Sequence, residues 1–421
     1  MSAFDKIYGY EKEKKELIYI CDMMNDPEKY RNFGVEIPKA ILLHGDPGLG
    51  KTLMAKALIE ESGRRSFACR KTRADGEFVD ILKKTFDDAI KNAPSIVFLD
   101  DMDKFAEDNL KSDSNKEEFV VIQSCLEDIK DKDVFVIATA NDICNLPSSL
   151  VRAGRFGKQL EFNLPPLDDS IKIIAHYLSG KKVAPDVDAE MIANILVGHS
   201  CAVLESVINE AGIYAAFEKS EYITKEHIVR AVLRVVLRTV ESEDLDEISM
   251  KKIAYHEAGH AVLAMHNKYK VGFVTIRRHG STGGICQSYG DEKSGMTYEK
   301  LKREITEKIA GKAAVELCFE TVDMGAGSDI DDATYLARRA IETRCVEGFE
   351  YGYDISNYCD KQAYQRVDRI TDKVYSLIQE CYNDCLEILK RNRALLDEIA
   401  SKLLEKRTLL YDDLKNYNTV Y

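Results

Sequence analysis

One eight-residue stretch constrains the fold of this chain more than any other part of its sequence. Residues 45–52 read GDPGLGKT and fit the pattern G-x-x-x-x-G-K-T. An apolar run of strand length, residues 40–44, precedes the stretch, and a helix-compatible segment, residues 53–59, follows it. Glycine-rich loops in this context bind phosphate, because main-chain N–H groups and the positive end of the helix dipole face the anion. The pattern therefore predicts an α/β nucleotide-binding domain.

Two further apolar runs support that fold class. Residues 95–99 and 134–138 are rich in β-branched side chains, and helical patterns separate them from each other and from residues 40–44. Such alternation is typical of a parallel sheet with crossover helices. We therefore expect residues 1–165 to form an α/β P-loop module.

The rest of the chain is predicted to be mostly helical. Pro165 and Pro166 end the strand pattern, and the periodicity after them predicts a small helical subdomain over residues 166–240. An acidic connector then opens a third domain, residues 241–421, which is mostly helical apart from strands and turns near its beginning. At roughly 150 residues per domain, a length of 421 residues agrees with three parts.

The P-loop suggests roles for several polar side chains. Lys51 is placed to reach the β- and γ-phosphates of ATP, and the Thr52 hydroxyl is placed to hold Mg²⁺. Asp100 and Asp101 end the second apolar run. In that position one carboxylate binds Mg²⁺, usually through water, and the next polarises the attacking water. Asn141, just beyond the third run, is a further candidate to orient that water.

Two arginines, Arg152 and Arg155, follow the third run. They lie too far along the chain to contact this subunit's own phosphate easily. One reading is ordinary surface charge. The other reading is a pair of arginine fingers that reach the γ-phosphate of a neighbouring subunit, which requires a ring.

A second motif, HEAGH at residues 256–260, predicts a metal site. His256 and His260 are four residues apart and therefore share one helix face, beside Glu257. Neutral imidazoles at this spacing suit Zn²⁺, and Glu257 is placed to accept a proton from water that the metal has acidified. Gly259 gives room for another segment to approach the helix closely.

His266 is a poor candidate for the third metal ligand. The extended zinc motif has a glycine where this chain has Leu263, and residues 261–265 are strongly helix-compatible. In a continuous helix, His266 points roughly 120° away from His260. It also lies roughly 9 Å further along the helix axis. We therefore assign His266 to ordinary structure and expect the third ligand from a distant segment.

Spacing alone does not choose that distant segment. Asp329 is a plausible source, since glycines precede it and a helical pattern follows it. The same position suits a helix N-cap, and the residues themselves leave both readings open.

Composition bears on partners and location. The formal net charge is -13 and no Lys/Arg cluster dominates any segment, which argues against nucleic-acid binding. The 11 cysteines include no Cys-x-x-Cys pair and suggest reduced thiols in a cytoplasmic protein. No window approaches the roughly 18 consecutive apolar residues of a membrane helix, so we expect a soluble chain.

Together these motifs resemble those of a known family. The GDPGLGKT loop, the strand that ends in two aspartates, the two arginines and HEAGH occur in the order of FtsH-type AAA+ zinc metalloproteases. The resemblance covers nearly the whole chain, and the combination of motifs is highly specific. It implies an ATP-dependent zinc endopeptidase that forms a homohexameric ring, unfolds and translocates loosely folded or unfolded proteins, and hydrolyses their peptide bonds. The implied cofactors are Zn²⁺, ATP and Mg²⁺.

For the peptidase, the resemblance implies specific residues. His256, His260 and Asp329 match the family's zinc ligands, and Glu257 matches its catalytic base. Residues 282–285 fall where the family presents an edge strand to the peptide, and main-chain pairing there suits cleavage that tolerates many sequences.

For the ATPase, the resemblance implies a second set of residues. Arg152 and Arg155 match the two arginine fingers, and Asp101 and Asn141 belong with the hydrolytic water. The implied nucleotide contacts are Ile7, Tyr8, Gly9, Asp46, Pro47, Gly48, Leu49, Gly50, Lys51, Thr52, Leu53, Asp100 and Ala202.

Four features depart from the family pattern, one of which is Lys158 at a third basic position where the family carries Arg. Family members usually carry Glu where this chain has Asp101, whose side chain is one methylene shorter, so water activation is expected to be weaker or differently placed. The pore loop, residues 73–79 here, lacks the family's aromatic residue, and Phe78 is the candidate substitute. The family is anchored in membranes by N-terminal helices that are absent from this sequence. We therefore expect either a soluble relative or a longer, membrane-associated gene product.

Two other functions are compatible with these motifs. A nucleotide-gated remodelling or binding ring with weak ATP hydrolysis would use the same P-loop. An ATP-independent peptidase that acts on unfolded chains would use the same metal site. The complete zinc motif favours the ATP-dependent protease.

Overall fold

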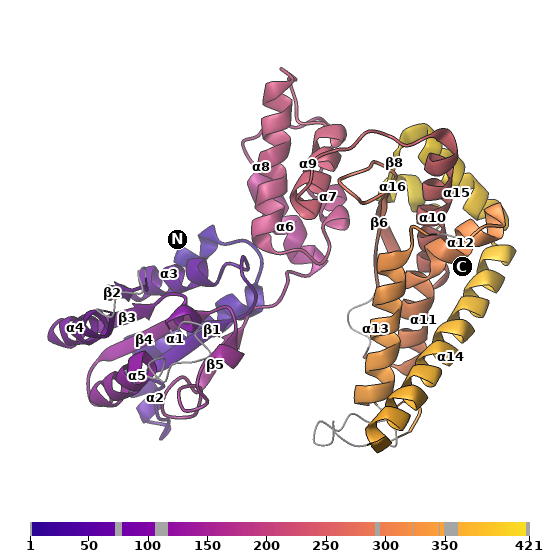
Figure 1. The fold of residues 1–421 in the computed structure, drawn as a ribbon. Coiled ribbons are helices and arrows are strands. Elements are labelled where there is room, and N and C mark those ends of the chain that lie inside the picture. The colour runs from indigo at the N-terminus through magenta and orange to yellow at the C-terminus, as the bar shows by residue number, and fades with distance from the viewer. Residues whose placement is uncertain are drawn as a thin grey trace. The chain divides into compact units, whose positions relative to one another are not determined.

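The computed structural model describes residues 2–71, 78–105, 117–290, 295–322, 324–344, 346–348 and 361–417, with the backbone alone for residues 361–368. The chain divides into two compact units (Figure 1). Unit 1 contains Met1–Val183 and Gly198–Ile223, and unit 2 contains Ala184–Val197 and Thr224–Tyr421.

Unit 1 is built on a five-stranded sheet. Its strands are β1 (Ala40–His44), β2 (Arg65–Cys69), β3 (Ser95–Leu99), β4 (Val134–Ala140) and β5 (Lys158–Glu161). Their spatial order is β2-β3-β4-β1-β5, and every neighbouring pair is parallel. The α/β fold class with a parallel sheet is therefore confirmed.

Unit 1 also contains helices before, between and after these strands. They are α1 (Glu11–Asn25), α2 (Pro27–Arg31), α3 (Lys51–Ser62), α4 (Phe78–Lys91), α5 (Glu117–Asp128), α6 (Leu167–Leu178) and α8 (Cys201–Phe217), with short 3-10 helices η1 (Ala3–Lys6), η2 (Met102–Lys104) and η4 (Ile143–Asn145). Phe86 of α4 and Ile122 of α5 share one buried cluster with Val97 of β3. Ile96 and Ile137 alternate to the opposite face and are fully buried as well. Both faces of the sheet are thus covered, as a parallel sheet requires.

The sheet brings the predicted nucleotide residues to one edge. The P-loop follows β1, the two aspartates follow β3, and Asn141 follows β4. Because these strands are adjacent and parallel, their carboxyl ends meet at the same edge, where α/β sheets bind ligands.

Phe78 is a core residue. Its side chain is 4% exposed, and its ring lies edge-on to Phe105 with 4.7 Å between ring centroids. The interpretation of Phe78 as an aromatic that grips substrate is therefore wrong, because the ring is enclosed by the hydrophobic core of unit 1. Most of the predicted pore loop, residues 73–77, lies outside the described residues.

Unit 2 is mostly helical, as the sequence predicts. Its helices are α7 (Ala189–Ile195), α9 (Lys225–Leu237), α10 (Glu247–His266), α11 (Tyr298–Lys308), α12 (Ala310–Phe319), α13 (Gly327–Arg344), α14 (Lys361–Arg391), α15 (Arg393–Lys406) and α16 (Tyr411–Leu414). Three antiparallel strands, β6 (Lys270–Thr275), β7 (Ile285–Tyr289) and β8 (Thr408–Leu410), form a small sheet in the order β7-β6-β8. Helix α10 is central, since Ala258, Ala261 and Val262 lie in the buried cluster that also holds α12 and α15.

The predicted subdomain over residues 166–240 is helical, but the two units divide it. Helices α6 and α8 belong to unit 1, whereas α7 and α9 belong to unit 2. The division into three domains with boundaries near residues 165 and 240 stays a prediction. No helix in the described ranges combines the length and apolarity needed to cross a membrane.

Candidate metal centre and nucleotide site

Helix α10 carries both histidines of the predicted metal site. Asp246 caps its start, accepting a hydrogen bond from the main-chain N–H of Ser249 at 3.0 Å, and the helix continues without a break to His266. One turn apart, His256 and His260 place their Nε2 atoms 3.2 Å from each other. The two imidazoles therefore converge on one point beside the helix.

Asp329 completes this group from the first turn of α13. Its Oδ2 atom lies 3.0 Å from Nε2 of His256 and 3.4 Å from Nε2 of His260. Asp329 lies inside the helix that begins at Gly327, and its carboxylate faces the histidines. The donor atoms of all three residues lie within 4.8 Å of one another. Two imidazole nitrogens and one carboxylate oxygen form the donor set of catalytic zinc, with a fourth position left for water or substrate.

The protein fixes the orientation of His260. Its Nδ1 atom lies 2.8 Å from the main-chain oxygen of Glu307 in the last turn of α11. A carbonyl oxygen can only accept, so Nδ1 carries the hydrogen and Nε2 presents its lone pair to the centre. Metal-binding histidines are commonly held in this way.

The carboxylate of Asp329 is kept charged. Burial by itself would raise the pKa of this carboxyl, but the adjacent imidazoles of His256 and His260 outweigh burial and hold the pKa well below its ordinary value. An ionised carboxylate is the form that binds a metal ion.

Glu257 lies next to the three converging groups. Its side chain is 6% exposed and lines the same cavity, about 1140 Å³ in volume. Burial raises the pKa of its carboxyl above the ordinary value, although the neighbouring histidines oppose the change. A carboxylate with a raised pKa holds a proton more readily, as a general base near neutral pH must.

Two glycines leave the space that this site occupies. A Cβ atom on Gly311 would lie 2.4 Å from Cε1 and Nε2 of His256. A Cβ atom on Gly284 would lie 2.7 Å from Cγ of Glu257. Gly259 allows the close approach that the sequence predicts, because a Cβ there would lie 2.6 Å from the Cβ of Ala314 in α12.

Strand β7 borders the cavity at the edge of its sheet. It begins at Ile285, the last residue of the predicted substrate segment, and within the described ranges it pairs with β6 on one side. Gly283, Gly284 and Ile285 line the cavity together with the metal-site residues. A free strand edge beside a metal site is suited to pairing with an extended peptide.

His266 is placed as the sequence predicts. It is the last residue of the unbroken helix α10, and its side chain is exposed. It does not belong to the metal-binding group found among the described residues.

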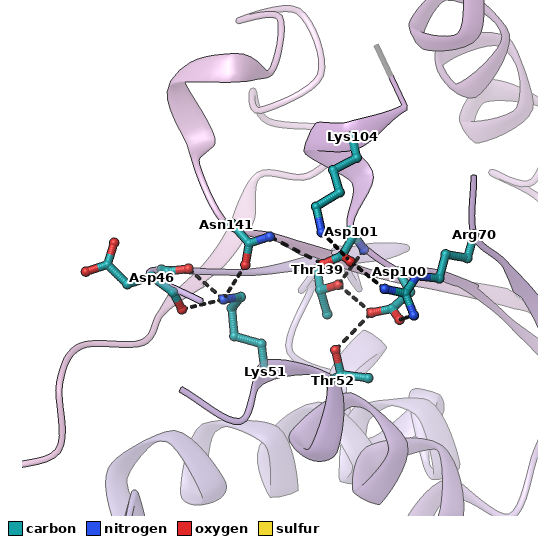
Figure 2. A network of polar contacts seen from close by, with 10 residues as sticks. Asp46, Lys51, Thr52, Arg70, Asp100, Asp101, Lys104, Thr139 and Asn141 are labelled. Carbon is teal, nitrogen blue, oxygen red and sulfur yellow. Dashed lines mark hydrogen bonds and ion pairs between the residues drawn. The ribbon is translucent and has the colours of Figure 1, made fainter. Parts of the chain in front are cut away.

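The nucleotide site lies in unit 1 (Figure 2). The Nζ atom of Lys51 lies 2.6 Å from the carbonyl oxygen of Gly45, and it also donates to Oδ1 of Asn141 at 3.0 Å. The hydroxyl of Thr52 donates to Oδ1 of Asp100 at 2.9 Å. The predicted phosphate and Mg²⁺ residues therefore meet in one network.

Most of the predicted nucleotide contacts line one cavity of about 550 Å³. They are Ile7, Tyr8, Pro47, Gly48, Leu49, Gly50, Lys51, Thr52, Leu53, Asp101, Asn141 and Ala202. Gly9, Asp46 and Asp100 are not among the residues that line it in the described part of unit 1. The main-chain N–H of Ala202 donates to the carbonyl of Gly48 at 3.0 Å, which attaches α8 to the P-loop.

The two arginines differ in their surroundings. Arg155 donates to the carbonyl of Ser149 at 2.7 Å and lies 3.6 Å from Glu127, so its guanidinium contacts its own chain. Arg152 is exposed. Neither belongs to the described lining of the nucleotide cavity, and their action on a neighbouring subunit stays a prediction.

Both sites lie in segments that match known families. Residues 244–417 match Peptidase family M41, and residues 41–164 match the ATPase family associated with various cellular activities. The chain is 30% identical to the ATP-dependent zinc metalloprotease FtsH 1 of Phytoplasma mali, over 98% of the chain and 70% of that relative. The chain belongs to the FtsH family.

Other members of the FtsH family are similar over the same span. The chain is 31% identical to the ATP-dependent zinc metalloprotease FtsH of Streptobacillus moniliformis, over 98% of the chain and 63% of that relative. It is 32% identical to the FtsH of Leptotrichia buccalis, over 98% of the chain and 56% of that relative. The chain thus covers less than two thirds of the length of these two FtsH proteins.

Several residues of this FtsH-family chain were not found from sequence. His176, which no motif indicated, stacks on the predicted contact Tyr8 with 4.2 Å between ring centroids, and both line the nucleotide cavity. No sequence motif could identify the carbonyl of Glu307 as a partner of His260, because every residue has a main-chain carbonyl. The need for glycine at positions 311 and 284 becomes clear only once it is known that His256 and Glu257 approach them.

Proposed function

We propose that this chain is an ATP-dependent zinc endopeptidase that acts on unfolded or loosely folded proteins. One observation carries the proposal: His256, His260 and Asp329 converge in a cavity that also holds buried Glu257 and borders the edge strand β7. Membership of the FtsH family supports the same activity. The nucleotide site of unit 1 supports coupling to ATP.

The peptidase chemistry follows from these side chains. Zn²⁺ held by the three ligands would acidify a water molecule and polarise the peptide carbonyl. Glu257 would accept the proton of the attacking water and then deliver it to the amine of the leaving peptide. The edge of β7 would align the substrate through main-chain hydrogen bonds, which do not depend on the substrate's side chains.

The ATPase chemistry would use the network around Lys51. Lys51 would leave its loop carbonyls and bind the β- and γ-phosphates, while Thr52 and Asp100 would hold Mg²⁺. Asp101 and Asn141 would orient the attacking water. Arg152 and Arg155 would complete the site of a neighbouring copy in a ring, which we propose to be a homohexamer. A cytoplasmic location stays a prediction from the thiol content.

A remodelling or binding ring without peptidase activity is less well supported. Such a ring would have no use for the hydrogen bond from His260 to Glu307 or for the space that Gly284 leaves beside Glu257. Both features serve the geometry of the metal site.

The test measures degradation of a loosely folded protein such as casein. The chain is assayed with ATP, with a slowly hydrolysed ATP analogue, and as the Glu257→Gln variant with ATP. We expect cleavage with ATP, much slower cleavage with the analogue, and none with the variant. Absence of cleavage in every reaction would refute the proposal, and equal rates with ATP and the analogue would indicate an ATP-independent peptidase.

A further inference from the structure

The 3-10 helix η2 places a lysine beside the carboxylate of Asp101. Asp101 adopts a left-handed backbone conformation, with φ of 57°, and caps the start of η2. That turn brings Lys104 back toward it, so that Nζ of Lys104 lies 2.9 Å from Oδ2 of Asp101. Both side chains line the nucleotide cavity together with Lys51.

Asp101 is part of a chain of contacts that runs to the P-loop (Figure 2). Its Oδ2 atom also lies 3.0 Å from Nη2 of Arg70, and its Oδ1 atom accepts a hydrogen bond from Nδ2 of Asn141 at 3.4 Å. Asn141 in turn accepts from Lys51 at 3.0 Å. Lys51 and Lys104 therefore approach the Asp101–Asn141 pair from two sides.

This end of the cavity is where the terminal phosphate belongs. Thr52 and Thr139 both donate to Oδ1 of Asp100 at 2.9 Å, which marks the place for Mg²⁺. Mg²⁺ in such sites bridges the β- and γ-phosphates. The aromatic side chain of Tyr8, in contrast, lines the same cavity in the segment expected to receive adenine.

We propose that Lys104 is a nucleotide-contacting residue that binds the γ-phosphate of ATP within its own chain. The inference rests on the proposed ATP site. The Lys104 side chain is 60% exposed, and Asp101 keeps Arg70 and Asn141 as partners when Lys104 leaves it, so exchanging Asp101 for a phosphate oxygen costs little. The triphosphate brings more negative charge than one carboxylate, and Lys51 and Lys104 would share it.

Lys104 would act during hydrolysis by its charge alone. Water attacks the γ-phosphorus, and the proton that it loses passes to the carboxylate of Asp101. The bond from that phosphorus to the bridging oxygen of ADP breaks, its electron pair stays on ADP, and inorganic phosphate leaves with the oxygen of the water. Positive charge near the transferred group stabilises this transition state, which is the role that an arginine finger has from a neighbouring subunit. Lys104 accepts and donates no proton in this step. When phosphate leaves, Lys104 returns to Asp101, which is the arrangement in the structure.

Substitution of Lys104 tests whether this residue contacts the γ-phosphate and not the rest of the nucleotide. The full chain is compared with Lys104→Met and Lys104→Arg, and with Lys91→Met as a control at a side chain that is 72% exposed and pairs with Asp88. For each protein, calorimetry measures the affinity for ADP and for a slowly hydrolysed ATP analogue with Mg²⁺. Phosphate release measures kcat for ATP.

The expected result is a selective loss in Lys104→Met. Affinity for the ATP analogue should fall roughly tenfold while affinity for ADP is unchanged, since one charged hydrogen bond is lost. The kcat should fall by about tenfold or more. Lys104→Arg should keep most of the affinity for the ATP analogue and most of the kcat. Lys91→Met should keep both at the level of the unaltered chain.

Two results would overturn the inference. Equal loss or no loss of ADP and analogue affinity would place Lys104 away from the γ-phosphate. Faster hydrolysis by Lys104→Met would mean that the lysine restrains Asp101 instead. Failure of the proposed ATP site is distinguishable, because the unaltered chain would then bind neither nucleotide.

Discussion

The Nδ1 atom of His260 lies 2.8 Å from the main-chain oxygen of Glu307, which joins the metal-binding helix α10 to the end of α11. Glu307 lies in the last turn of α11, and its carbonyl oxygen accepts this hydrogen bond from a side chain of another helix. The contact fixes the tautomer of His260 whatever side chain stands at position 307. The geometry of the site thus depends on main-chain positions as much as on its ligands.

Gly311→Ala is expected to weaken zinc binding. The new Cβ would lie 2.4 Å from Cε1 of His256, so the imidazole must move away from His260 and Asp329. Because small losses of ligand orientation cost roughly 10- to 100-fold in metal affinity, we expect a loss of that size. Competition with a chromophoric chelator measures the affinity. Gly327→Ala is the control, since a Cβ there meets nothing within 4 Å, and an unchanged affinity in Gly311→Ala would contradict the packing described here.

Gly284→Ala is expected to lower peptide cleavage without weakening zinc binding. Its Cβ would lie 2.7 Å from Cγ of Glu257 and 2.7 Å from the carbonyl oxygen of Thr275, so the base is displaced while the metal ligands stay. Loss of general-base catalysis should lower kcat for peptide cleavage by roughly 10²-fold or more. Peptide cleavage and zinc content are measured on the same preparation. Loss of zinc together with activity would show that Gly284 supports the ligands and not the base.

Asp329→Asn is expected to lose zinc. The amide keeps the size of the side chain but removes the charge that the two histidines face in this structure. Elemental analysis after dialysis should find about one zinc per chain in the unaltered protein and far less in the variant. Asp331→Asn, an exposed neighbour in the same helix, serves as the matched control. Full zinc occupancy in Asp329→Asn would remove Asp329 from the ligand set.

His266→Ala is expected to keep both zinc and activity. The side chain is exposed at the last residue of α10 and is not part of the metal-binding group. Exposed substitutions of this kind usually change stability by at most about 0.5 kcal/mol. Zinc content and cleavage rate are the readouts. A large fall in zinc content would mean that His266 reaches the metal.

The sequence predicts the parts of the fold that its local patterns encode. Strands β3 and β4 are fully buried in the parallel sheet and β1 is buried except at its last residue, so all three read as apolar runs. Strand β2 begins with Arg65 and Ser66, and β5 reads Lys-Gln-Leu-Glu. These are the two edge strands of the sheet, where one side of the backbone is open and polar residues are tolerated, so neither gave a clear signal.

The metal site, too, combines residues that a local pattern predicts with one that it does not. The four-residue spacing of His256 and His260 is local, and a helix turns it directly into a shared face. Asp329 arrives from a distant segment, and only the family resemblance chose it among many carboxylates. Phe78 is predicted to replace the pore-loop aromatic because of its residue type and position alone. Its ring instead packs into the core of unit 1.

Removal and return of zinc tests the central claim most directly. The chain is stripped with a strong chelator, dialysed, and assayed for degradation of casein with ATP before and after addition of one equivalent of Zn²⁺. The account predicts that degradation falls to background in the stripped protein and returns with zinc, while Glu257→Gln stays inactive in both states. Degradation at an undiminished rate by protein shown to be zinc-free would contradict it.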